Sequence, residues 1–79
     1  MQKNWEDLAN AIVLQGIEDY RAARRRLRRG RKKKRKKAII QARKTIRRVE
    51  RFCRSKWFSQ LTDIDGERLI RQLKEERIR

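Results

Sequence analysis

A dense run of cationic side chains is the feature of this sequence that most clearly suggests a chemical role. Residues 28–37 read RRGRKKKRKK, and Arg21, Arg24, Arg25 and Arg26 precede them. Cations that approach phosphates release condensed counterions and so gain affinity, whereas a run without interleaved aromatic rings offers little base recognition. The run therefore predicts a phosphate-binding segment. The alternatives are a solvated charge run or a targeting sequence.

A second cationic set follows downstream, at spacings of three and four residues. Its two stripes are Arg43, Arg47, Arg51 and Arg54, and Lys44 with Arg48. This spacing places each stripe on one flank of a helix, which could lie along a phosphate backbone or enter a major groove. An ordinary solvent face is the alternative. Sequence-specific recognition is not expected, because Gln41 is the only base-reading amide in this stretch.

All members of these two sets except Arg26 are the predicted nucleic-acid contacts, with DNA and RNA left open as partners. They are Arg21, Arg24, Arg25, Arg28, Arg29, Arg31, Lys32, Lys33, Lys34, Arg35, Lys36, Lys37, Arg43, Lys44, Arg47, Arg48, Arg51 and Arg54.

Catalysis, a metal site and a cofactor are not expected. The chain has no His, and its one Cys can form neither an intramolecular disulfide nor a thiolate zinc cage. Asp63, Asp65 and Gly66 resemble part of a calcium loop, but Leu61 would stand at its first position and Gln72 would replace its closing Glu. A helix cap at Asp65 is expected instead, and the chain is not expected to be an enzyme.

The aromatic residues could stack on unpaired bases or pack in a core. They are Trp5, Tyr20, Phe52, Trp57 and Phe58. Helical periodicity favours packing for four of them. Phe58 is the expected exception, because Trp57 beside it is predicted to point inward. Cys53 is expected to be a small core residue.

The charge is concentrated in the middle of the chain. Of 79 residues, 26 are Lys or Arg and 10 are Asp or Glu, a net charge of +16, and residues 21–59 hold 20 of the cations with Glu50 as their only acid. This segregation favours a dedicated polyanion-binding surface. A chain this short has a thin core or shares one with a second copy, so a homodimer is an open alternative.

Apolar spacing predicts three helices. The first runs from a cap at Asn4 to an end at Gly30, with Gly16 as a point of close approach to another helix. The second covers residues 35–54, and an irregular or single-turn connection leads to a third that begins at Asp65, with Ile64 and Leu69 as its hydrophobic staple.

The expected fold is therefore all-α, a small three-helix domain with a long antiparallel helical hairpin and a short C-terminal helix. Residues 1–79 form one domain, and residues 28–37 are expected to be a basic low-complexity connection within it.

Two flanking segments, WEDLANAIVLQGIEDYR and ERFCRSKWFSQLTDIDGERLIRQLKEE, resemble short, largely uncharacterised proteins encoded in phages and prophages of Gram-positive bacteria. They cover roughly 45 of the 79 residues, most strongly the pattern R-S-x-W-F-x-x-L-T-D-I-D-G-E-x-L-I between Arg54 and Ile70. The RRGRKKKRKK run departs from a less basic segment in that family. The resemblance implies a phage setting and no particular activity.

Two functions remain as hypotheses. The first is a phage-encoded small basic protein that binds nucleic acid through phosphate contacts, without catalysis, in the cytoplasm of a bacterial host cell. The alternative is an anti-CRISPR type inhibitor of a host RNA-guided nuclease or of another host defence protein or nucleoprotein complex. No membrane partner is expected, because the longest apolar stretch, Ala11–Leu14, is too short to span a bilayer.

Overall fold

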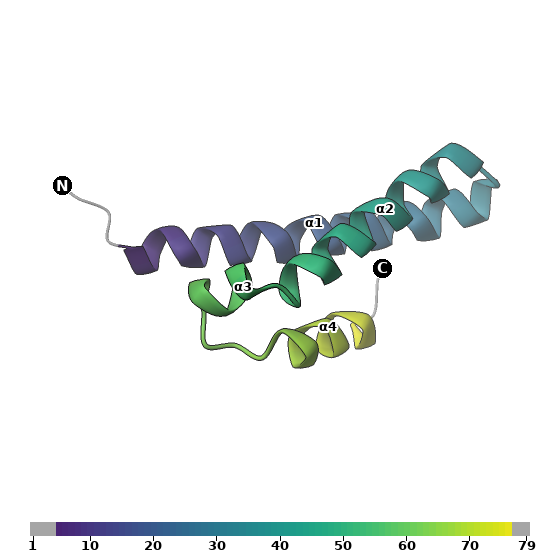
Figure 1. The fold of residues 1–79 in the computed structure, drawn as a ribbon. Coiled ribbons are helices and arrows are strands. Elements are labelled where there is room, and N and C mark those ends of the chain that lie inside the picture. Colours follow the sequence, from purple (N-terminus) through teal and green to yellow (C-terminus); the bar gives the residue numbers. More distant parts are fainter. Residues whose placement is uncertain (1–4, 77–79) are drawn as a thin grey trace.

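A long helical hairpin dominates the protein (Figure 1). The computed structural model describes residues 5–76, and every regular element within them is a helix. The helices are α1 (Trp5–Lys33), α2 (Lys36–Cys53), α3 (Lys56–Leu61) and α4 (Gly66–Glu75). The predicted all-α fold is confirmed. The connection expected to be irregular or a single turn contains the short helix α3, so four helices rather than three occur in this part of the chain.

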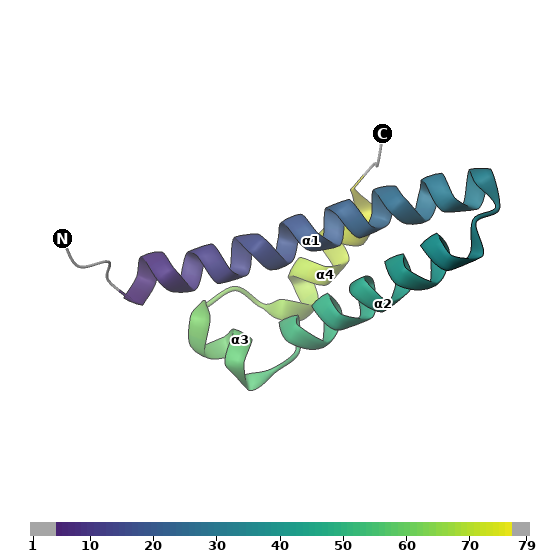
Figure 2. The same ribbon diagram turned by 90° about the horizontal axis from the view of Figure 1, so that it is seen from above.

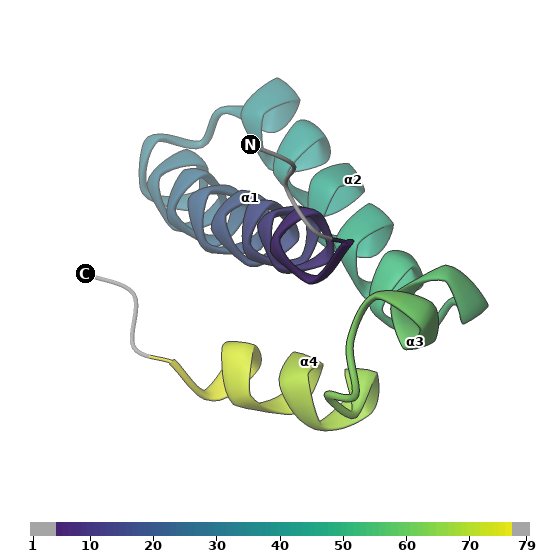
Figure 3. The ribbon, with the colours of Figure 1, turned by 90° about the vertical axis from the view of Figure 1, so that its left-hand side faces the viewer.

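The helices are arranged around the open end of the hairpin (Figures 1 and 2). α1 and α2 run antiparallel, α3 lies at their open end, and α4 packs on one side of both (Figure 3). We call this side of the hairpin the α4 side and the opposite side the open side. The closed end of the hairpin extends beyond α3 and α4, which makes the molecule elongated, at 46 × 28 × 20 Å.

The core lies where all four helices meet. Its buried members are Ala9, Val13, Tyr20, Val49, Cys53, Phe58, Leu61, Ile70 and Leu73. The α1 and α2 members recur at helical spacing, as the sequence predicts, so burial of one apolar stripe on each helix accounts for the hairpin. The predicted core position of Cys53 is confirmed. The predicted cap at Asn4 lies outside the described residues.

The connection between α1 and α2 is shorter than expected. α1 continues through Gly30 to Lys33, so most of residues 28–37 are helical and the connection is Lys34 and Arg35 alone. The Arg35 N–H donates to the Gly30 carbonyl at 2.9 Å, and Lys34 takes the left-handed conformation, with φ 53°. This is the Schellman arrangement that ends helices, with a lysine at the position where glycine is usual.

The prediction that Gly30 ends α1 is wrong. Gly30 lies inside the helix, and its lack of a side chain makes room for packing against α2. A Cβ atom on Gly30 would lie 3.1 Å from Cγ1 of Ile39, so the missing side chain lets α2 approach. Ala23 on α1 and Ala42 on α2, each 1% exposed, allow the same close contact. Near its closed end, therefore, the hairpin is held by a seam of small side chains.

The structure reverses the expected roles of Trp57 and Phe58. Phe58 is 2% exposed and packs edge to face against Phe52, with 5.5 Å between the ring centroids. Trp57, in contrast, is 46% exposed. Successive residues of a helix point about 100° apart, so α3 can turn only one of the two rings inward, and Phe58 shares the inward face with Leu61 three residues later. Trp57 instead meets Trp5 at 6.0 Å, and Trp5 is itself 54% exposed, against its expected core position.

The predicted cap of α4 is confirmed. Oδ1 of Asp65 accepts hydrogen bonds from the backbone N–H groups of Glu67 at 3.0 Å and Arg68 at 3.5 Å. Of the two staple residues, Leu69 packs against the core while Ile64 remains exposed. This geometry assigns Asp65 to capping rather than to a calcium loop.

Replacing Lys34 by Gly should stabilise the protein by up to about 1 kcal/mol, because a left-handed conformation strains every residue except glycine. The control Lys34→Gln removes the same charge and leaves the strain. We expect the melting temperature of the Gly variant, followed by circular dichroism, to exceed that of the Gln variant by a few degrees. Equal melting temperatures would show that the turn stores no such strain.

Phe58→Ala should lower the free energy of unfolding by about 3 to 5 kcal/mol, since it empties a fully buried site. Trp57→Ala should cost less than about 2 kcal/mol, because half of the ring is already in solvent. Urea unfolding of both variants measures the difference. A larger loss for Trp57→Ala than for Phe58→Ala would contradict the orientation of α3.

Candidate nucleic-acid interface

The closed end of the hairpin carries the main concentration of charge. We define the hairpin tip as residues 24–47, which hold 15 Lys or Arg and no Asp or Glu. It comprises the last turns of α1, the Lys34–Arg35 turn and the first half of α2. Most of it projects beyond α3 and α4 (Figure 2), so its cationic side chains face solvent on several sides.

On the α4 side, the tip forms a groove of about 460 Å³, which we call the α4-side groove. Its lining residues are Tyr20, Arg24, Leu27, Arg28, Arg31, Lys32 and Ile46. Tyr20 is buried and Leu27 and Ile46 are half-buried, whereas Arg28, Arg31 and Lys32 are exposed. The groove therefore combines an apolar floor with a cationic rim.

On the open side, the tip forms a second groove, of about 210 Å³, which we call the open-side groove. Its lining residues are Arg26, Arg29, Gly30, Lys33, Arg35, Ala38 and Gln41. At 3.6 residues per turn, its α1 cations point roughly 150° away from those of the α4-side groove. The two grooves therefore lie on opposite sides of the hairpin.

Arg21, Arg24, Arg48 and Arg54, all predicted contacts, bind partners on other parts of the fold. Arg21 forms two hydrogen bonds with Glu76, at 2.7 and 2.9 Å, and Arg24 donates to the Leu73 carbonyl. Arg54 meets Glu67 at 2.5 Å, and Arg48 lies 4.0 Å from Asp19. Three of these contacts join the hairpin to α4 and its C-terminal end, and the fourth joins α1 to α2. These arginines serve the fold, and the structure separates Arg21, Arg48 and Arg54 from the tip.

The pKa shifts at these pairs have a local cause. The hydrogen bond to Glu76 raises the pKa of Arg21, and the same contact lowers the pKa of Glu76. The hydrogen bond to Glu67 likewise raises the pKa of Arg54. Each charged form is favoured by its partner.

The cationic stripe predicted on α2 is divided by the same geometry. Arg43 and Arg47 are exposed and belong to the tip, whereas Arg54, at the other end of the stripe, pairs with Glu67 and lies 4.0 Å from Glu50. Arg51 is exposed between these two ends. Only the first half of the stripe can act together with the basic run of α1.

Tyr20 marks the inner end of the α4-side groove. Its hydroxyl donates to Oε2 of Glu50 at 3.4 Å. Burial, together with the negative charge of Glu50, raises the pKa of Tyr20 to about 12. The phenol therefore stays neutral at physiological pH; its ring lines the groove while its hydroxyl donates to Glu50.

No family model, curated protein or solved structure matches the chain. Across residues 5–76, none of the helices combines the length and apolar character needed to cross a bilayer.

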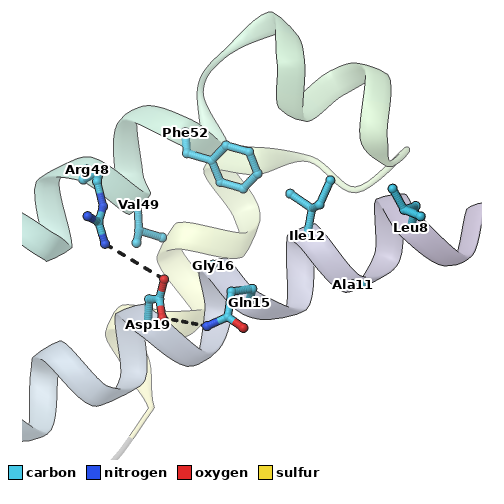
Figure 4. Close-up of a pocket in the computed structure, with 9 residues that line it drawn as sticks. All are labelled: Leu8, Ala11, Ile12, Gln15, Gly16, Asp19, Arg48, Val49 and Phe52. Carbon is cyan, nitrogen blue, oxygen red and sulfur yellow. Dashed lines mark hydrogen bonds and ion pairs between the residues drawn. The ribbon is translucent and has the colours of Figure 1, made fainter. Parts of the chain in front are cut away.

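A third groove, of about 540 Å³, lies on the open side near the open end of the hairpin, with α4 behind it (Figure 4). Its lining residues are Leu8, Ala11, Ile12, Gln15, Gly16, Asp19, Arg48, Val49 and Phe52. The predicted close approach at Gly16 is confirmed, since a Cβ atom there would lie 3.3 Å from the Phe52 ring. This apolar groove was missed at the sequence level, because several of its residues share the spacing of core positions.

Sequence reasoning also missed two groove residues at the tip. Arg26 was not among the predicted contacts, and Gln41 was considered only as a base reader, yet both line the open-side groove. Arg26 stands next to Arg25 in a stretch of consecutive arginines, so residue type gives no signal of which of them faces a groove. Only the packing of α2 against α1 makes that distinction.

Proposed function

We propose that this protein binds nucleic acid without catalysis, through phosphate contacts made by the hairpin tip. The observation that carries the proposal is the concentration of 15 cations, with no acid among them, on an end of the fold that projects from the core. A nucleic-acid backbone supplies the matching array of negative charge. A phage setting and a cytoplasmic location remain predictions from the sequence.

Mutual repulsion at the tip supports a polyanionic partner. Like charges four residues apart on a helix cost about 0.2 to 0.5 kcal/mol each. α1 contains four such pairs between Arg24 and Lys33, namely those formed by residues 24 and 28, 25 and 29, 28 and 32, and 29 and 33. An anion that binds across these pairs relieves the repulsion, so binding stabilises the folded hairpin.

The placement of the aromatic rings favours backbone contacts over base recognition. Phe58 is buried, Tyr20 is buried at the base of the tip, and Trp5 and Trp57 meet at the opposite end of the hairpin. The tip therefore presents no exposed ring on which an unpaired base could stack. Phosphate contacts alone fix a position on nucleic acid without reading its sequence.

The alternative function, inhibition of an RNA-guided nuclease or another host defence protein, has one observation in its favour. The apolar groove, with Leu8 exposed at its edge, offers the kind of surface that contacts proteins. A pull-down from phage-infected cells, with and without nuclease treatment, separates the two functions. Partners lost after nuclease support nucleic-acid binding, whereas a host defence protein that survives supports the alternative.

Binding should weaken steeply with salt. If six to ten phosphates are contacted, affinity for a short DNA or RNA should fall by roughly a thousandfold or more between about 50 and 200 mM salt. The same salt should raise the melting temperature of the free protein, because it screens repulsion within the tip. Fluorescence anisotropy and thermal melts measure the two effects. A shallow salt slope, or strong discrimination among duplex sequences, would contradict the proposal.

Neutralising the tip should remove binding and leave the fold intact. The tip variant carries Gln at Lys32, Lys33, Lys36 and Lys37, and a control of equal net charge carries Gln at the exposed residues Arg51, Lys56, Arg68 and Arg71. We expect affinity at one fixed salt concentration to fall at least tenfold further in the tip variant than in the control. Circular dichroism should show unchanged helical content in both.

Equal losses of affinity in these two variants would mean that net charge alone governs binding. A larger loss in the control would move the interface to the C-terminal end of α2, to α3 and to α4.

A further inference from the structure

The two grooves of the tip place cations on opposite sides of a rigid hairpin. Arg31 and Lys32 line the α4-side groove, and Arg26 and Lys33 line the open-side groove. The seam of Ala23, Gly30 and Ala42 lies between them and holds α1 tightly against α2. A ligand in one groove is therefore separated from the other groove by the thickness of the hairpin.

A short duplex that lies along one side of the tip does not reach the groove on the other side. The α1 cations that line the two grooves point roughly 150° apart around the helix axis. Double-stranded DNA has a persistence length of about 150 base pairs, so a segment of roughly 20 to 30 base pairs resists even a bend of about 40 to 90°. Wrapping around the tip would require a sharper bend still.

When one duplex binds, the opposite groove keeps its cations without a counter-charge from that duplex. We propose that the hairpin tip binds two nucleic-acid duplexes at once, one in each groove, and so bridges them. This inference rests on the proposed function, because it assigns two separate sites to the same phosphate-binding surface. A single copy of the chain is sufficient for bridging.

The test uses the full chain and two populations of short DNA duplexes, one labelled with a donor and the other with an acceptor fluorophore. Bridging brings the two labels together, so energy transfer should rise as protein is added. It should fall again when protein exceeds duplex, because each duplex then carries its own protein molecules. Anisotropy of one labelled duplex measures simple binding in parallel.

Three variants of identical net charge separate the two grooves. The α4-side variant is Arg31→Glu with Lys32→Glu, the open-side variant is Arg26→Glu with Lys33→Glu, and the mixed control is Arg26→Glu with Arg31→Glu. Each reversal removes two charges, so all three variants have a net charge of +12. Circular dichroism confirms that each variant is folded before it is compared.

The two readouts should order the variants in opposite ways. Each one-sided variant keeps one groove intact, so its affinity for a single duplex should stay within about threefold of wild type while its energy transfer is lost. The mixed control weakens both grooves by one reversal, so its single-duplex affinity should fall further while it retains more energy transfer. A difference in net charge cannot produce these opposite orders, because all three variants have the same net charge.

Each other result overturns a different statement. If the wild-type protein binds neither the duplexes nor single-stranded RNA, the proposed function fails, and if it binds only the single strand, bridging alone fails. If it binds duplex with no energy transfer at any ratio, bridging fails while the proposed function stands. If both one-sided variants still bridge, two copies of the chain must be joining the duplexes, and the assignment of one duplex to each groove is wrong.

Discussion

Repulsion among the cations of the tip is opposed by a narrow seam of small side chains between α1 and α2. The seam consists of Ala23 and Gly30 on α1 and Ala42 on α2, and Ile39 packs where Gly30 has no side chain. Such residues bury little apolar area, whereas the four like-charged pairs on α1 cost together about 1 to 2 kcal/mol. A domain of this size has a total stability of roughly 4 to 12 kcal/mol. The tip must therefore depend on the other end of the hairpin for its stability.

That other end provides the compensating interactions. Glu50, on α2, lies 3.5 Å from Lys74 and 4.0 Å from Arg54, and it accepts the Tyr20 hydroxyl hydrogen bond. It thereby links α4 and both legs of the hairpin beside the common core. The acidic residues that pair with cations are concentrated here, so the fold separates a well-packed end that holds these ion pairs from a tip whose own residues include no acid.

This separation explains why a polyanion can act on both stability and function. Anion binding at the tip relieves repulsion where the packing is weakest, without disturbing the core formed with α3 and α4. Because the seam is built from residues with little or no side chain, α1 and α2 approach closely and leave their cations on both outer sides. The same close packing that permits the hairpin also creates two opposed basic grooves.

The sequence by itself determined that α1, α2 and α4 form, that Asp65 caps α4 and that the middle of the chain is cationic, because periodicity, capping chemistry and charge are local properties. Tertiary structure decided which ring of the Trp57–Phe58 pair is buried, since that choice depends on how α3 meets Phe52 and Leu61. It also decided that Gly30 packs against Ile39 while Lys34 ends the helix. The contacts of Arg21, Arg24 and Arg54 with α4 and its C-terminal end followed from where α4 lies. No residue type carries that information, because a partner's position in space is set by the packing of all four helices together.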